Sequence, residues 1–246
     1  MKHAPLIFIL LFTMSMTSSF KTHQLTHSRV KEAYLKYESD VHAYLSPCEI
    51  NIRGFEIYLR CFKHEEILEL WAKNKKDKRY KLLKTYDLCG FSGTLGPKRA
   101  QGDYQIPEGF YHIDRFNPKS KFHLSLGINY PNTSDKILSN KLHPGGDIFI
   151  HGGCQTIGCM PISDTWIEEL YVFCVEARNS GQGSIPVNIF PFKMDNDKLE
   201  FMKASYQELE SNFKFWEDIQ PGYLLFEKNK SLPEITILKN GAHAIN

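Results

Sequence analysis

The sequence has little excess charge of either sign: 30 Lys and Arg residues face 28 Asp and Glu residues, which leaves a formal net charge of +2. No stripe of basic residues stands out, so neither nucleic acid nor an anionic membrane surface is expected as a partner. Internal repeats and low-complexity segments are also missing. With 246 residues, of which 42% are apolar and 24% charged, the chain has the composition of a globular protein with one sizeable core.

The six cysteines are too few for a small disulfide scaffold. Whether they form disulfides depends on whether the protein resides in an oxidising compartment. Residues 1–19 combine a basic start at Lys2, an apolar run and small residues at the end, which is the layout of a secretory signal peptide. The apolar run is about eleven residues long, well short of the roughly 20 that span a bilayer. We therefore expect cleavage near Ser18 or Ser19, with an uncleaved anchor or a buried N-terminal helix as the alternatives.

The remaining chain predicts one α+β domain with added helices at both ends. Apolar residues at helical spacing predict a helix that Pro47 ends: Val30, Tyr34, Tyr37, Val41 and Tyr44. Alternating or apolar runs predict strands at residues 56–62, 67–72, 80–88, 122–130, 147–150 and 185–192. A helix over 65–73 remains open, and the Gly- and Pro-rich residues 90–118 indicate tight turns around short strands.

Two further helices and a polar loop are expected in the second half. Apolar residues from 167 to 175 fall on one helical face, and Thr165 and Glu168 have the spacing of a capping box. A C-terminal helix is indicated by Met202, Tyr206, Leu209, Phe213 and Trp216. The polar residues 131–146 precede an apolar strand and predict a mobile cover over a site.

Chemistry is concentrated in residues 148–164, IFIHGGCQTIGCMPISD. His151 is expected at the end of a strand, where a Gly-rich turn begins. Cys159 is expected in a second turn, just before a helix. An imidazole and a helix N-terminus both favour the thiolate, so we expect a Cys159 nucleophile of low pKa with His151 as its base. Gly158 allows a sharp turn at Cys159, whose neighbouring amides are expected to form an oxyanion hole.

Three other interpretations of this segment remain open. Cys154 and Cys159 could form a disulfide, since sequence spacing cannot establish disulfide geometry. His143 and His151 could bind zinc together with the two cysteines, although the spacing of familiar structural zinc sites is absent. His151 could also be an ordinary strand residue. After the nucleophile is assigned, an odd number of cysteines is left, so at least one thiol is expected to stay unpaired within the chain.

At this point the residues resemble a known family. His151-Gly152 followed by Thr156-Ile157-Gly158-Cys159 looks like the L,D-transpeptidase catalytic (YkuD) domain. The stretches GTLGPKRAQGDYQIPEGFY, FHLSLGINYPN and IEELY are similar to the YafK-like branch of that family, and the resemblance covers roughly residues 50–195. It implies a β-rich catalytic domain over residues 48–195. A signal peptide (1–19) and a helical segment (20–47) would precede this domain, and a helical extension (196–246) would follow it.

The resemblance also implies a function. It implies a secreted enzyme of the bacterial periplasm or cell envelope that acts on peptidoglycan stem peptides, with Cys159 as nucleophile and His151 as base, and without a metal or cofactor. The expected reaction is acyl transfer or hydrolysis at the diaminopimelate carbonyl, and a wall-attached protein could be the acceptor or the released product. Many family members have His at the position of Ile157, and Arg or Asn soon after the cysteine, where this chain has Met160-Pro161. Recognition of the substrate carboxylate is therefore expected to differ.

Other residues are expected to support this site. Thr156 and Gly152 would hold the loop or the oxyanion together with Gly158. His123 and Ser125 alternate on one face of a predicted strand, so they are expected to line the substrate cleft or to form an exposed strand face. The non-enzymatic alternative is a catalytically inactive, secreted domain that binds the cell wall.

Overall fold

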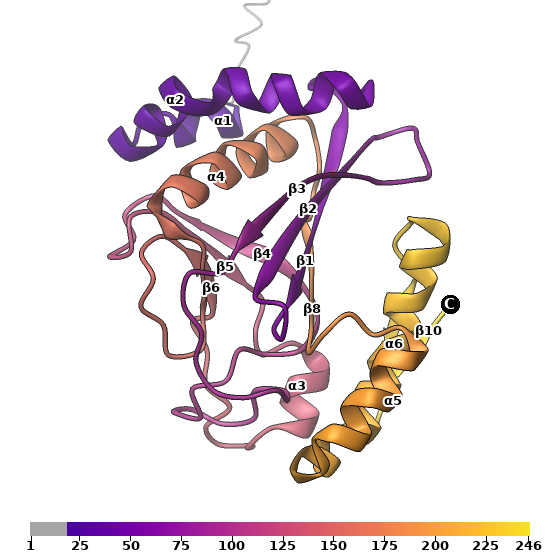
Figure 1. The fold of residues 1–246 in the computed structure, drawn as a ribbon. Helices are drawn as coiled ribbons and strands as arrows, with labels where there is room; N and C mark the ends of the chain where they lie inside the picture. The colour runs from indigo at the N-terminus through magenta and orange to yellow at the C-terminus, as the bar shows by residue number, and fades with distance from the viewer. Residues whose placement is uncertain (1–18) are drawn as a thin grey trace, which may run out of the picture.

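The computed structural model describes residues 19–246 and shows a mixed α+β fold in which helices flank one large sheet (Figure 1). The expected signal peptide lies outside the described residues except for Ser19, whose hydroxyl accepts a hydrogen bond from the Thr22 amide and so caps the first helix. The α+β class with helices added at both ends is confirmed. Within the described part of the chain, no helix is long and apolar enough to cross a membrane.

An eight-stranded sheet forms the centre, in the order β3-β2-β1-β8-β4-β5-β6-β7. The strands are β1 (Phe55–Phe62), β2 (Ile67–Asn74), β3 (Lys81–Asp87), β4 (Gly109–Asn117), β5 (Ser125–Ile128), β6 (Phe149–His151), β7 (Met160–Pro161) and β8 (Pro186–Phe190). Neighbouring strands are antiparallel except β1 with β8 and β6 with β7, which are parallel. Strand β2 excludes the helix that remained open over 65–73, and β5 is shorter than expected.

Two helical layers cover one face of the sheet. Helix α4 (Ser163–Asn179) packs on the strands, and α2 (Ser28–Leu45) lies over α4, with the short α1 (Phe20–Gln24) beside it (Figure 1). The apolar positions that predicted α2 are the ones it buries, among them Val30 and Val41. Helix α2 ends at Leu45, and a single 3-10 turn (Ser46–Cys48) that contains Pro47 follows it.

The C-terminal residues pack on a second apolar cluster around Phe62, Phe190 and Trp216. The single C-terminal helix expected there is wrong: α5 (Asn196–Ser205) and α6 (Glu210–Asn229) are separate helices joined by a 3-10 turn (Gln207–Leu209). A two-stranded sheet of β9 (Ile235–Ile237) and β10 (His243–Ile245) completes this part. Short apolar runs at helical spacing do not reveal such a break, because both helices present apolar residues to the same cluster.

Two local expectations also need correction. Helix α4 begins at Ser163 with Ile162 as a cap that makes no side-chain hydrogen bond, so the capping box of Thr165 and Glu168 is wrong. The polar segment 131–146 is only partly a loop, because it contains α3 (Thr133–Leu138), which has its own capping box between Asn132 and Asp135.

Candidate active site

His151 and Cys159 are brought to one edge of the sheet by the pairing of β6 with β7. His151 is the last residue of β6, and Cys159 directly precedes β7. The parallel register sets Ile150 opposite Met160, and both side chains are fully buried in the core. The pairing therefore sets the backbone of Cys159 beside the strand that ends in His151. The His151 side chain is not among those that line the cleft beside Cys159, and the Cys159 thiol donates to the Asp147 carbonyl at 3.6 Å.

The hydroxyl of Thr156 fixes the loop around Cys159. It accepts hydrogen bonds from the backbone amides of Cys159 at 2.8 Å and Gly158 at 3.2 Å, and it donates to the Cys159 carbonyl at 2.9 Å. Gly158 has a φ of 126°, and a Cβ there would lie 2.9 Å from the carbonyl oxygen of Gln105. Glycine is thus required both by the backbone conformation and by the close approach of a second loop.

The hydrogen bonds of Thr156 also bear on the expected oxyanion hole. Two amides of the Cys159 loop, those of Gly158 and Cys159, already donate to the Thr156 oxygen. A substrate oxyanion could use them only by sharing or displacing that hydroxyl. The sequence could not show this competition, because a threonine three residues before the cysteine is equally compatible with free amides.

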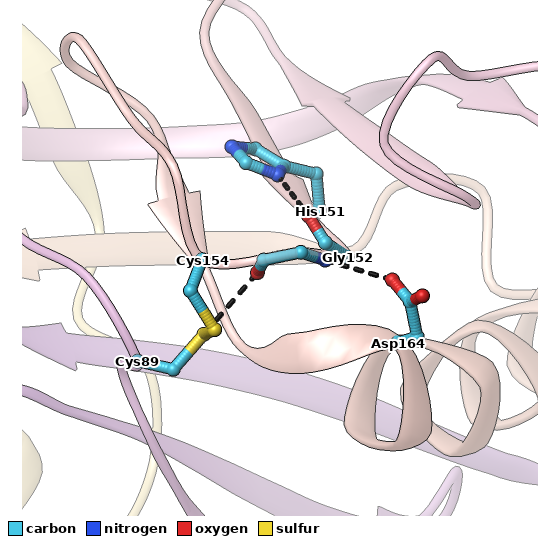
Figure 2. The surroundings of a disulfide bond; sticks show 6 residues. Cys89, His151, Gly152, Cys154 and Asp164 are labelled. Atoms are coloured by element: carbon cyan, nitrogen blue, oxygen red, sulfur yellow. Dashed lines mark hydrogen bonds between the residues drawn. A yellow bond between two sulfur atoms is a disulfide. The ribbon is translucent and has the colours of Figure 1, made fainter.

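A disulfide ties the same loop to a distant part of the chain. Cys89, just after β3, is bonded to Cys154, and the Sγ of Cys89 also lies 3.2 Å from the Gly153 carbonyl oxygen (Figure 2). The Cys89 amide donates to the carbonyl of Pro161 at 3.0 Å, so this segment contacts both ends of the loop. The alternative of a disulfide between Cys154 and Cys159 is therefore wrong, and Cys159 is a free thiol.

The start of α4 holds the other side of the loop. The carboxylate of Asp164 accepts a hydrogen bond from the Gly153 amide at 2.8 Å (Figure 2). A Cβ at Gly152 would lie 2.4 Å from that carboxylate and 2.8 Å from the Phe122 carbonyl oxygen, so only glycine fits there. Sequence reasoning missed Asp164, because it placed the helix cap at Thr165, three residues later than the observed cap at Ile162.

The His151 side chain is 2% exposed and oriented by two contacts. Its Nδ1 lies 2.5 Å from the Gly152 carbonyl oxygen, which accepts but cannot donate, so Nδ1 carries the proton and a neutral ring has its lone pair on Nε2 (Figure 2). The ring of Phe122 packs on the imidazole with 4.6 Å between centroids. Burial lowers the pKa of His151 below its ordinary value, which favours the neutral, basic form.

The turn that carries Phe122 is held by the N-terminal helix. Arg29 of α2 donates to the carbonyl oxygens of Ser120 at 2.6 Å and His123 at 2.7 Å. Phe122 itself is 44% exposed, so it covers His151 from the solvent side. The N-terminal helical segment thus fixes the turn whose Phe122 ring packs on the imidazole. No pattern in the sequence indicated this contact.

The state of the thiol differs from the expectation. Burial raises the pKa of Cys159 above its ordinary value, and the nearby Asp147 adds to this, while the Phe149 amide and Lys98 oppose it. The cysteine precedes a strand rather than the first turn of α4, so the helix dipole does not act on it as expected. The expected low thiol pKa is therefore wrong, and the resting pair is a neutral thiol and a neutral imidazole.

A cleft of about 510 Å³ opens on Cys159. Its walls come from the loop after β3, from the segment before β6 and from the Cys159 loop: Lys98, Gln101, Gly102, Tyr104, Leu142, His143, Pro144, Gly145, Gly146, Asp147, Ile148, Ile157 and Cys159. Only the second half of the expected cover, residues 142–146, lines the cleft. The first half is anchored elsewhere, because Ser134 of α3 donates to the Gly241 carbonyl at 2.6 Å.

His123 and Ser125 lie outside this cleft lining. The Nε2 of His123 is 2.6 Å from the carboxylate of Glu168 on α4, and its backbone has a φ of 64°. Ser125 is buried in β5, directly opposite His151 in the antiparallel register. Among the described residues, no group of three or more His, Cys, Asp or Glu side chains is arranged to hold a metal ion.

The site thus combines a free thiol on a cleft with a neutral histidine on the neighbouring strand, and comparison with known proteins identifies the family. The chain is 35% identical over 198 residues to the Escherichia coli K12 protein named "Putative L,D-transpeptidase YafK", covering 79% of this chain and 76% of that protein. The chain belongs to the YafK-like L,D-transpeptidase family. No family model matches the sequence.

Among solved structures, similarity is more distant. The helical cell shape determining protein Pgp2 from Campylobacter jejuni aligns with a TM-score of 0.45 at 17% identity, over 74% of this chain and 73% of that one. Bdellovibrio bacteriovorus Bd1075 aligns with a TM-score of 0.42 at 19% identity, over 76% and 78%. The disulfide fits a protein of an oxidising compartment outside the cytoplasm.

Proposed function

We propose that the protein is a peptidoglycan-modifying cysteine enzyme that transfers the acyl group of a stem peptide at its diaminopimelate carbonyl. Support comes from membership of the YafK-like L,D-transpeptidase family and from one observation in particular. Cys159 is a free thiol that opens on a cleft, its backbone amide is held by Thr156, and His151 on the neighbouring strand keeps the lone pair of its Nε2. Signal cleavage near Ser18 or Ser19 would deliver the enzyme to the periplasm or cell envelope.

The neutral pair defines how the reaction would begin. The Nε2 of His151 takes the proton of the Cys159 thiol as the sulfur attacks the substrate carbonyl carbon, so charge develops only on the way to the transition state. The imidazolium then gives that proton to the leaving amine, the carbon–nitrogen bond breaks, and a thioester remains. An incoming amine, or water, attacks the thioester, loses its proton to His151 and releases Cys159 as a thiol.

The acceptor decides the product. An amine of a second stem peptide gives a cross-link, an amine of a protein gives a wall-attached protein, and water gives hydrolysis or release. Residues 142–146 line the cleft beside the thiol, and we propose that this part of the polar segment covers the bound acyl group. Shortening residues 139–146 should change the ratio of transfer to hydrolysis while leaving α3 and cooperative unfolding intact.

Product analysis on purified sacculi tests the proposal. Cys159→Ala should abolish the thioester and all new products, because no neighbouring group replaces the sulfur, and His151→Ala should leave a folded protein with greatly reduced activity. Cys48→Ala is the matched control, since Cys48 is a free, half-buried thiol outside the cleft lining. Mass spectrometry of the digested sacculi and of the intact protein reports products and thioester together.

Two outcomes would contradict the proposal. Products that persist in Cys159→Ala would exclude this cysteine as the nucleophile. Binding to sacculi without any thioester or product, in parent and variants alike, would instead favour an inactive wall-binding domain. The pH profile adds a check, since activity should persist below the ordinary pKa of histidine if the neutral His151 is the base.

A further inference from the structure

The cleft beside Cys159 contains a lysine that the proposed chemistry does not use. Lys98 is 4% exposed, yet it lines the cleft, on the wall formed by the loop after β3. The acidic residue of the cleft wall, Asp147, turns its side chain to solvent and pairs with Arg115 at 2.9 Å. We infer that the Lys98 ammonium is the binding group for a free carboxylate of the substrate peptide.

The ammonium has a donor left for a ligand. Its Nζ donates to the Asp103 carboxylate at 2.5 Å and to the Ala100 carbonyl at 2.9 Å. Among the described residues, these two hydrogen bonds use two of its three hydrogens. The carboxylate of Asp103 also accepts from the amides of Arg99, Ala100 and Gln105 at 2.8 to 3.1 Å. Those amides share the stabilisation of the negative charge, so the ammonium is not confined to neutralising Asp103.

A glycine keeps this ammonium accessible from the cleft. Gly145 lines the cleft beside Lys98, and a Cβ there would lie 2.9 Å from the lysine Cε and 3.4 Å from its Nζ. A side chain at this position would cover the charge, whereas the glycine, with a φ of 86°, leaves space beside it. The buried stem and the open end are the arrangement that holds a ligand anion at a fixed place.

The position fits a carboxylate close to the reacting carbonyl. Lys98 and Cys159 line one cleft of about 510 Å³, so a group held by the lysine lies on the same bound molecule as the carbonyl attacked by the sulfur. An ammonium is a compact point charge that binds carboxylates well. This inference rests on the proposed function, because the stem peptide supplies both a carbonyl at the cysteine and a free carboxylate.

Binding measurements separate the inference from the catalysis. Affinity for a stem peptide with free carboxylates and for the same peptide with amidated carboxyl groups is measured by calorimetry on the Cys159→Ala protein, which cannot consume either ligand. Lys98→Met should weaken binding of the free peptide about tenfold or more, as expected for a lost charged hydrogen bond, and binding of the amidated peptide less than twofold. Lys98→Arg retains the charge and should keep most of the preference for the free peptide.

The controls distinguish charge recognition from a structural role. Lys141→Met makes the same chemical change on an exposed lysine of the neighbouring segment, outside the cleft lining, and should leave both affinities unchanged. Gly145→Ala should reduce the preference for the free peptide by covering the ammonium. Equal loss for the two peptides in Lys98→Met, or no loss, would overturn the inference while leaving the proposed function standing. If the parent protein binds and converts neither peptide, the proposed function fails first.

Discussion

Removal of the disulfide between Cys89 and Cys154 should destabilise the protein strongly. The two cysteines are 65 residues apart in the sequence, and the chain-entropy relation for a closed loop of that length gives about 4 kcal/mol from the lost constraint on the unfolded chain. The double variant Cys89→Ala/Cys154→Ala should therefore unfold at a lower denaturant concentration. Cys159→Ala is included in both proteins, so that the remaining reactive thiol cannot form new disulfides.

Urea denaturation followed by circular dichroism measures this difference. The unfolding free energy of the double variant should fall by several kcal/mol, and a reducing agent should lower that of the parent by a similar amount without affecting the variant. A decrease below about 1 kcal/mol would refute the reasoning, since it would mean that the closed loop does not restrict the unfolded chain.

The same variant reveals whether the disulfide also positions the reactive loop. Cys154 lies between Gly153, which is held by Asp164, and Thr156, which holds Cys159. With Cys159 restored, alkylation of its thiol should be faster in the double variant if the loop opens locally, at denaturant concentrations where the protein stays folded. An unchanged rate would show that Thr156 and Asp164 are sufficient to fix the loop.

Three further predictions concern single residues. Thr156→Val should cost about 1 to 2 kcal/mol of unfolding free energy and speed alkylation of Cys159, because two amides and a carbonyl lose their hydroxyl partner, whereas Thr156→Ser should restore both values. Phe122→Ala should raise the pKa of His151 toward its ordinary value by admitting water, which moves the acid limb of the activity profile to higher pH; an unmoved limb would contradict the role of this ring. Burial raises the pKa of Asp135 to about 6, so the stability contributed by the protonated carboxyl group is present below pH 4 and is lost as the pH rises through 6. The unfolding free energy, measured from pH 4 to 7, should therefore fall by up to about 3 kcal/mol relative to that of Asp135→Asn. Parallel curves for the two proteins would refute this prediction.

The sequence predicted the elements whose pattern is local. Alternating or apolar runs located β1 to β3, helical spacing located α2 and α4, and the pattern His-Gly followed by Thr-x-Gly-Cys located the candidate site. These features depend on neighbouring residues, which a single sequence displays directly. The same pattern agrees with the family membership that comparison with the Escherichia coli protein shows.

What the sequence did not reveal depends on residues that are far apart in the chain. The partner of Cys154 is 65 residues away, and Arg29 reaches a turn more than ninety positions later, at Ser120 and His123. The thiol pKa likewise depends on how deeply Cys159 is buried, which spacing to a helix does not define. Such contacts are set by packing of the whole domain, so local periodicity carries no signal for them.

The central position of β8 has a consequence for the order in which the protein can fold. This strand pairs with β1 on one side and β4 on the other, so the three strands β1 to β3 and the four strands β4 to β7 share one sheet only through it. The pairing of Leu59 with Val187 spans 128 residues of chain, which makes the closing contact one of high contact order. A nascent chain that ends before residue 186 has two unjoined strand groups with exposed edges, and the edge that carries His151 becomes part of a continuous sheet only after Pro186–Phe190 has been made.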